Sequence, residues 1–357
     1  MQETMRFTSP TIDTDLVMDM KQRLNYVDVA KGLLILMVIY NHTGNLASAS
    51  GVHNELIDFI PETHFFKPFF MPAFFIIAGY CSNYEKSFKK FVITNAKALL
   101  IPAVLLLFVR MLVRFVFTGT FSTLEWNGIT SKAAIFNLGY WNWFLTALFF
   151  TKALFYVLLH GIKLFRIRFA IICLLHVLGV IIYNFKGERI IYYNFYFYQH
   201  VLMYVVFIEI GYDISIKIYK GLGLPTNMVV FFAVYIAYLL IGRKIPSITS
   251  DPYLPIVDII PHLIMAVCGS LMIIELSKKI KENDSLEAFG RHSLVIYCLH
   301  FQFMFSFYQI FKDQLNMMSF HHTVTSLIIL YVFTAYGCLW CSKLLNTKYL
   351  KWMLGKF

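Results

Sequence analysis

The amino-acid sequence predicts an all-α integral membrane protein, a bundle of about ten transmembrane helices with both termini in the cytoplasm. Hydrophobic residues make up 59% of the 357 residues and charged residues only 14%, whereas soluble domains carry about 25% charged residues. Apolar stretches of about 20 residues, the length that crosses a bilayer, recur from Val27 to the C-terminus with short polar breaks. These breaks leave no room for a soluble catalytic domain.

Short connections separate the ten expected spans. We place the spans at residues 27–46, 66–83, 92–118, 142–160, 168–185, 194–212, 227–242, 255–277, 291–311 and 323–345. The residues before the first span are polar, without the basic and then apolar run of a cleaved signal peptide. We therefore expect a polar cytoplasmic segment over 1–24, one transmembrane domain over 25–346 and a short basic cytoplasmic tail over 347–357.

The distribution of Lys and Arg supports this topology. If the connections alternate between the two sides from a cytoplasmic N-terminus, 20 of the 31 Lys and Arg residues fall on the cytoplasmic side and 7 on the other. Cytoplasmic loops carry the excess of Lys and Arg in membrane proteins, so the alternation agrees with ten spans. The net charge of +11 is spread over many loops, which argues against a nucleic-acid partner.

The six cysteines predict neither a disulfide framework nor a metal site. All of them lie in or beside apolar segments. The C-x-x-C pair, Cys338 and Cys341, has no second pair or nearby His that would complete a zinc site. We expect no metal.

The first span carries the densest set of polar side chains: Asp28, Lys31, Asn41 and His42. His42 follows Lys31 by eleven positions, which is three helical turns plus about 20° and a rise of about 16 Å, so both side chains share a face. In one interpretation, Asp28 and Lys31 form an ion pair at the interface while Asn41 and His42 end the helix. In the other, Lys31 holds an anionic donor and His42 is the base of a reaction centre.

Five segments carry recognisable sequence patterns, namely the first span and four later segments. The first span reads D-x-x-K-G with His42 eleven residues after Lys31, and the others are FFMPAFFIIAGY (69–80), KALLIP (97–102), YWNWFLTALFF (140–150) and FGRHSLVIYCLH (289–300). With these five segments in this order, the chain resembles acyltransferase family 3, a family of integral membrane acyltransferases. The resemblance is strongest to its branch of sugar O-acetyltransferases related to fucose 4-O-acetylase.

Three positions depart from the family pattern. Lys31 stands where Arg is commoner, and a Lys ammonium lacks the planar fork with which Arg binds phosphate, although it can act as a point charge. Phe70 stands where many sugar O-acetyltransferases have His, and Ala78 where they have Ser. The polar roles of those two positions are therefore not carried over.

The resemblance implies an O-acyltransferase in a bacterial inner (plasma) membrane. It would move an acetyl group from acetyl-CoA, or another acyl group from its CoA ester, to a hydroxyl of a cell-envelope carbohydrate or polysaccharide, which could be lipid-linked or polymeric. Either a direct attack, with His42 as base, or an acyl-histidine intermediate is compatible. The residues expected to act are His42, His300 and Asn41 in catalysis; Lys31, Asp28, Lys97 and Lys90 at the donor; and Trp143, Tyr297 and Tyr80 at the acceptor.

Three further charged residues within the spans are interpreted as structural. Glu209, Arg110 and Arg114 lie within expected spans, and we expect them to pair with one another across helices.

The alternative function is a secondary transporter or lipid-linked glycan exporter, in which buried charges relay protons or bind substrate. No paired halves or matched Gly/Pro-interrupted helices support it. A third possibility, a membrane sensor or scaffold, leaves the contexts of His42 and His300 unexplained.

Overall fold

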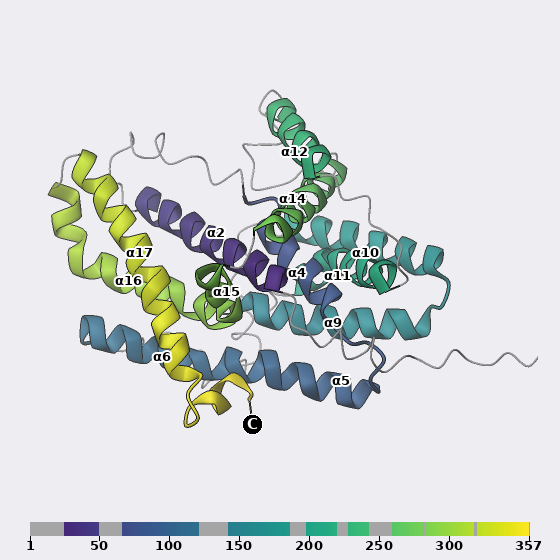
Figure 1. Cartoon of the computed structure of the whole chain (residues 1–357), viewed down its shortest axis with the longest axis horizontal. Coiled ribbons are helices and arrows are strands. Elements are labelled where there is room, and N and C mark those ends of the chain that lie inside the picture. Colours follow the sequence, from purple (N-terminus) through teal and green to yellow (C-terminus); the bar gives the residue numbers. More distant parts are fainter. Residues whose placement is uncertain are drawn as a thin grey trace, which may run out of the picture.

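A computed structural model describes residues 25–49, 66–120, 142–185, 198–219, 228–242, 259–280, 283–317 and 320–356. Within these ranges the regular elements are all helices (Figure 1). They are α2 (Asn25–Ala49), α4 (Phe70–Tyr80), α5 (Phe88–Asn95), the π-helix η2 (Ala96–Leu100), α6 (Ile101–Thr118), α9 (Trp143–Gly161), α10 (Phe165–Phe185), α11 (Tyr198–Tyr219), α12 (Met228–Gly242), α14 (Ile259–Lys279), α15 (Asp284–Arg291), α16 (Ser293–Met317), α17 (Phe320–Leu345) and the 3-10 helix η4 (Lys351–Leu354).

Each of the ten predicted spans contains a helix, which confirms the all-α class. In the part of the chain that the structure describes, seven helical stretches are long and apolar enough to cross a membrane, the longest being Phe88–Thr118, which joins α5, η2 and α6. The apolar helix α4 is shorter, and α2 carries the polar residues of the first span. The number of ten crossings and the cytoplasmic location of both termini stay predictions.

The short helix α15 was not predicted, because it lies in a polar connection between two expected spans. Asn283 caps it by accepting a hydrogen bond from the backbone N–H of Leu286 at 3.0 Å, which satisfies one of the unpaired N–H groups at the helix start. An ion pair between Arg291 and Glu287 at 3.0 Å joins its turns. Helix α15 packs against α2.

Two glycines allow α2 and α15 to approach closely. A Cβ atom on Gly290 would lie 1.8 Å from the carbonyl oxygen of Asp28, and one on Gly32 would lie 2.1 Å from that of Leu286. Both glycines belong to the family patterns of the first and ninth spans. Helices α4 and α11 share the same arrangement, with Gly79 against Ile208 and Gly211 against Ile76.

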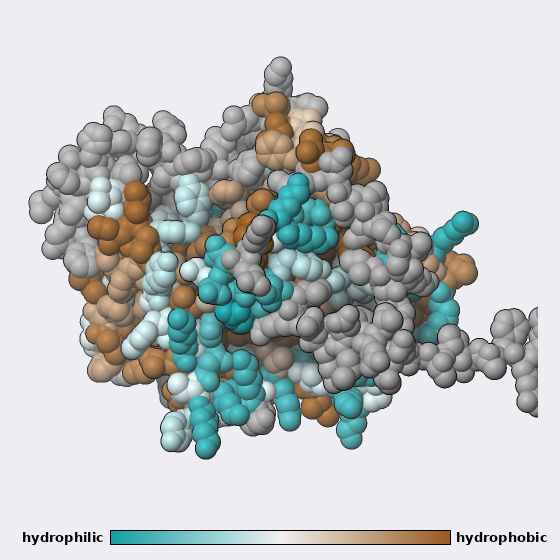
Figure 2. All heavy atoms as spheres, viewed as in Figure 1, coloured by the Kyte–Doolittle hydropathy of each residue, from teal (hydrophilic) through white to brown (hydrophobic). Residues whose placement is uncertain are grey.

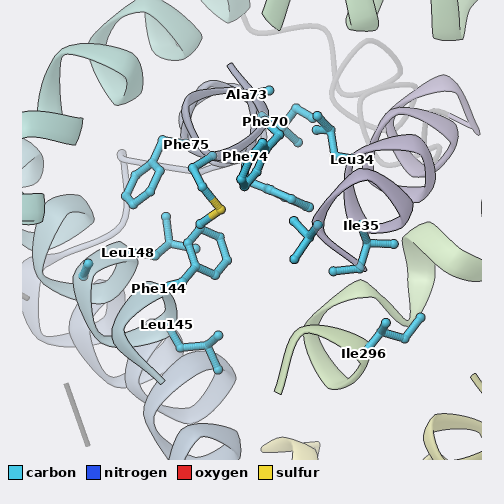
Figure 3. Close-up of a cluster of buried hydrophobic side chains, with 14 of the residues drawn as sticks. Leu34, Ile35, Phe70, Ala73, Phe74, Phe75, Phe144, Leu145, Leu148 and Ile296 are labelled. Atoms are coloured by element: carbon cyan, nitrogen blue, oxygen red, sulfur yellow. The ribbon is translucent and has the colours of Figure 1, made fainter. Parts of the chain in front are cut away.

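The centre of the bundle is a core of buried apolar side chains. Figure 3 shows Leu34 and Ile35 of α2, Phe74 of α4, Phe144 of α9 and Ile296 of α16 converging from four helices. The outer faces are also apolar: Figure 2 shows hydrophobic residues over α12 and the outer part of α17, while hydrophilic residues gather over α15 and the end of α17. This distribution is typical of a bundle whose outer faces contact lipid.

The expected pairing of Glu209 with Arg110 and Arg114 is wrong. Glu209 of α11 instead binds Arg168 of α10 through two hydrogen bonds, 2.8 Å to Nη2 and 2.9 Å to Nε. The two side chains are 1% and 8% exposed, so both charges are buried and paired in the bidentate geometry that Arg favours. The sequence placed Arg168 in a loop next to the fifth span, and only the packing of α10 on α11 brings the two together.

The C-terminal tail folds back onto the bundle. Leu354 of η4 is buried, and η4 packs against α6. Gly355 has a left-handed backbone, with φ of +68°, and a Cβ atom there would lie 1.8 Å from the carbonyl oxygen of Lys97. The tail is therefore held against the π-turn η2.

We expect Gly290→Ala to destabilise the protein, because the new methyl group would meet the backbone of α2 and force the helices apart. Overpacking of this kind costs about 1–3 kcal/mol, which thermal denaturation of the purified protein in detergent would measure. Gly161→Ala, at a helical position with nothing within 4 Å, is the matched control and should leave the transition unchanged. Equal transitions for the two variants would show that the glycine contact is not tight.

We expect Glu209→Gln to lower the thermal stability strongly, because it leaves the Arg168 guanidinium buried without its carboxylate. Removing one partner of a buried ion pair costs about 3–5 kcal/mol. Asp213→Asn is the matched control on the same helix, since Asp213 pairs with Lys217 at 2.6 Å where both side chains are exposed to solvent. An exposed pair contributes at most about 1 kcal/mol, and comparable losses in the two variants would contradict the structural role of the buried pair.

Candidate active site

Two histidines from distant spans meet inside the bundle. The ring centroids of His42 on α2 and His300 on α16 are 5.0 Å apart, and the ring planes are inclined by 41°. Phe301 borders His42, with centroids 6.1 Å apart. The structure thus brings together the two histidines that the sequence assigned to catalysis.

The helix that carries His300 holds its ring in one tautomer. Its Nδ1 atom lies 2.7 Å from the carbonyl oxygen of Tyr297 and 3.1 Å from that of Ile296. Because a carbonyl oxygen can only accept a hydrogen bond, Nδ1 carries the proton of the neutral ring. The other nitrogen, Nε2, is buried and has no hydrogen-bond partner among the described residues. Its lone pair can therefore accept a proton or a hydrogen bond from a neighbouring group.

Asn41, the third predicted catalytic residue, lies beside His42 on α2. It is 5% exposed, and its Oδ1 atom makes no hydrogen bond to the part of the chain that the structure describes. A buried amide usually has hydrogen-bond partners. The side chain is therefore a polar group that a substrate at the histidine pair could satisfy.

Arg110 of α6 is a site residue that the sequence analysis assigned only a structural role. It is 4% exposed, and its guanidinium lies close enough to His300 and Cys298 to act on both electrostatically. Helix α6 packs along α16, with Arg114 over the ring of Phe305 at 5.6 Å. The signal that could have found Arg110 was its charge within an apolar span, which marks a functional candidate.

The predicted donor residues Asp28 and Lys31 lie near the opposite end of α2. Lys31 Nζ is 3.8 Å from Asp28 Oδ1, with the two side chains 29% and 3% exposed. The ion pair of the first interpretation is therefore present. Its separation is longer than the 2.7–2.9 Å of a charge-assisted hydrogen bond, so it leaves the ammonium able to contact a ligand.

The other donor and acceptor residues are divided between several places. Tyr80 accepts a hydrogen bond from Tyr26 at 2.9 Å, which places it at the start of α2, about 24 Å along the helix from His42. Lys90 on α5 and Lys97 on η2 are exposed. Tyr80 therefore lies far from the histidine pair, unlike the other two predicted acceptor residues, Trp143 and Tyr297.

Three aromatic rings, those of Trp143, Phe144 and Tyr297, form an aromatic wall next to His300. Trp143 and Tyr297 are the other two residues predicted to bind the acceptor. The centroid of Tyr297 is 5.9 Å from that of His300 and 5.0 Å from that of Phe144. Phe144 in turn contacts Trp143 at 6.1 Å. Trp143 and Tyr297 therefore belong to one chain of ring contacts that ends at His300.

His200 of α11 joins this wall and was missed in the sequence. It is 7% exposed, its ring lies 4.5 Å from the indole of Trp143, and it stacks on Tyr204 with planes 9° apart. The sequence offers no motif around His200. Only the packing of α9 on α11 shows that it belongs here.

No group of three His, Cys, Asp or Glu side chains that could hold a metal ion occurs within the described ranges. The groups that the described site offers are the His42 and His300 rings, the Asn41 amide and the charge of Arg110. Such a set can move a proton and stabilise a developing negative charge.

Comparison with known proteins assigns the chain to a family. The model of an acyltransferase domain matches residues 24–343, which covers α2, the histidine pair and most of α17. No curated protein and no solved structure matches the chain significantly. The family model spans most of the chain, and the protein belongs to acyltransferase family 3, the membrane acyltransferases that its sequence motifs resemble.

Proposed function

We propose that the protein is an O-acetyltransferase that moves an acetyl group from acetyl-CoA to a hydroxyl of a carbohydrate in a bacterial cell envelope. The observation that carries this proposal is the contact between His42 and His300 inside a member of an acyltransferase family. The resemblance to sugar O-acetyltransferases supports the acceptor class and the inner membrane. The aromatic wall around Trp143 and Tyr297 suits a sugar ring, whose C–H groups pack on aromatic faces.

In the proposed direct transfer, His42 removes the proton of an acceptor hydroxyl as its oxygen attacks the thioester carbonyl. The C–O bond forms, the C–S bond breaks, and the CoA thiolate leaves and takes up a proton. In this proposal the two rings, whose centroids are 5.0 Å apart, rotate so that His300 Nε2, which has no hydrogen-bond partner among the described residues, accepts a hydrogen bond from one nitrogen of His42. That bond keeps the other nitrogen of His42 unprotonated, in the way that a third group orients a catalytic base. Arg110 and the Asn41 amide stabilise the oxyanion.

The same residues suit transfer in two steps. In that case a His42 nitrogen attacks the thioester carbonyl and forms an acyl-histidine, while the C–S bond breaks and the CoA thiolate leaves and takes up a proton. The acceptor hydroxyl then attacks the acyl group, the C–N bond breaks, and the hydroxyl proton passes to the released His42 nitrogen. Retention of labelled acetyl groups on the protein in the absence of acceptor would distinguish this route from the direct one. Both routes place the thioester at His42.

The donor in this proposal reaches His42 from the end of α2 that carries Lys31. The two residues are separated by about 16 Å along one face of the helix. A long flexible thioester can span that distance while its charged end stays near Lys31. This arrangement holds the phosphates at the Lys31 end of α2 and delivers only the acyl end to the histidines.

We expect His42→Ala to abolish transfer of label from acetyl-CoA, and His300→Ala to reduce it strongly, because a positioned base contributes about 10²–10⁴-fold to a rate. His160→Ala, at an exposed position on α9, is the matched control and should keep full activity. Size-exclusion profiles and circular dichroism would verify that the variants are folded. Full transfer by folded His42→Ala would exclude the proposed base.

We expect cells that lack the gene to lose base-labile O-acetyl groups from an envelope glycan, which mass spectrometry of isolated glycans would detect. The wild-type gene should restore them and the His42→Ala gene should not. Trp143→Ala should restore them several-fold less well, because an aromatic contact contributes about 0.5–1.5 kcal/mol, whereas Trp340→Ala, exposed on α17, should restore them fully. Identical glycans with and without the gene would exclude the carbohydrate acceptor.

A further inference from the structure

Lys152 on α9 is a largely buried cation with neutral partners. Its Nζ atom donates a hydrogen bond to Asn95 Oδ1 and lies 5.9 Å from the centroid of Phe91. Among the described residues it forms no ion pair with a carboxylate. A charge within the membrane bundle normally pairs with an opposite charge or lines a pathway, so this ammonium is suited to an anionic ligand.

Asn95 is oriented to hold Lys152. Its Nδ2 atom donates to the carbonyl oxygen of Phe91 at 2.9 Å, which fixes the amide and points Oδ1 towards the ammonium. Asn95 is buried and directly precedes the π-helix η2. π-Turns within helices are frequent at functional sites, and here the turn places Asn95 against α9.

The segment that follows α4 connects the surroundings of Lys31 on α2 with those of Lys152 on α9. Tyr80, the last residue of α4, accepts a hydrogen bond at 2.9 Å from Tyr26, which precedes Lys31 by five positions on α2. Tyr84 packs on Phe91, the ring that Lys152 faces, with centroids 5.2 Å apart. Cys81 follows Tyr80 directly. Cys81 is exposed to solvent, so its thiol can be reached by a reagent. Lys86 lies beside the same helix as Lys152, since its carbonyl oxygen accepts a hydrogen bond from Tyr156 of α9 at 2.7 Å, and its charge adds to the positive potential.

We propose that Lys31 and Lys152, with Asn95 holding Lys152, form an anion site beside Cys81 that binds phosphate groups of the acyl donor. This inference rests on the proposed function and adds Lys152, Asn95 and the position of Cys81 to it. Lysines act on phosphate as point charges, which suits two ammoniums that approach from separate helices. Asp28 neutralises part of the charge of Lys31 but none of that of Lys152.

The site differs from the surface lysines that the sequence assigned to the donor. Lys90 and Lys97 are exposed, where solvent and salt screen their charges. Lys152 is held within the bundle, where its charge is screened less. A phosphate between Lys152 and Lys31 would also lie at the end of α2 from which the acyl group can reach His42.

Protection of Cys81 from a maleimide tests the proposal in the purified full-length protein. CoA should slow the labelling of Cys81, located by peptide mass mapping, whereas pantetheine, which lacks the phosphates, should not. Lys152→Met should raise the CoA concentration for half-protection about tenfold or more, the value of a charged hydrogen bond. Lys163→Met, at an exposed position just beyond α9, should leave it unchanged.

Asn95→Asp is a second variant in case Lys152→Met does not fold. It places a carboxylate against Lys152, so it should weaken protection by CoA while keeping the contact between α5 and α9. Unchanged protection in a folded Lys152→Met or Asn95→Asp protein would overturn the role of Lys152. Equal protection by pantetheine, or protection by inorganic phosphate or an anionic lipid but not by CoA, would overturn the assignment to the donor.

The results of these experiments distinguish a failure of the proposed anion site from a failure of the proposed function. If CoA does not protect Cys81 in a protein that still transfers label from acetyl-CoA, the anion site is wrong and the acetyltransferase assignment stands. If CoA protects Cys81 through Lys152 but no transfer occurs, the site is supported and the proposed reaction fails.

Discussion

The close approach of α2 and α15 is the contact on which the arrangement of the site depends. Gly32 and Gly290 each face a backbone carbonyl of the opposite helix, at distances that no Cβ atom could occupy. In a membrane, helices are held together by close packing rather than by a hydrophobic effect between them, and small residues permit it. The two glycines therefore do more than tolerate the contact, since their lack of a side chain sets the distance and register of the two helices.

Both ends of the proposed site follow from that register. The residue pairs Gly32 with Leu286 and Asp28 with Gly290 show that α15 crosses α2 in the opposite direction. The chain then turns at His292, and α16 returns along α2 until His300 meets His42. One contact thus holds Asp28 and Lys31 at the start of α2 and aligns the two histidines further along it.

The buried charges divide into two kinds that differ in their partners. Glu209 and Arg168 satisfy each other with two short hydrogen bonds, so that pair needs no ligand and serves to join α10 to α11. Lys152 has an amide and an aromatic ring around its ammonium, and His300 has an unused ring nitrogen. Since burial of an unmatched polar group is costly, the second kind marks the places where we propose that substrate groups bind.

The sequence by itself determined the helical spans and the family, and it singled out the two histidines, His42 and His300, as candidate site residues. Apolar length, the Lys and Arg alternation and the motif order are local properties, and each of the ten predicted spans contains a helix. Tertiary structure alone decided which side chains meet: Glu209 with Arg168 instead of Arg110, Arg110 near His300, His200 on Trp143, and Lys152 with Asn95 and Phe91. It also showed α15, whose eight residues are too short and polar for a hydropathy signal. The physical reason is that hydropathy fixes how long each helix is, whereas the rotation and register between helices depend on close contacts at a few small residues.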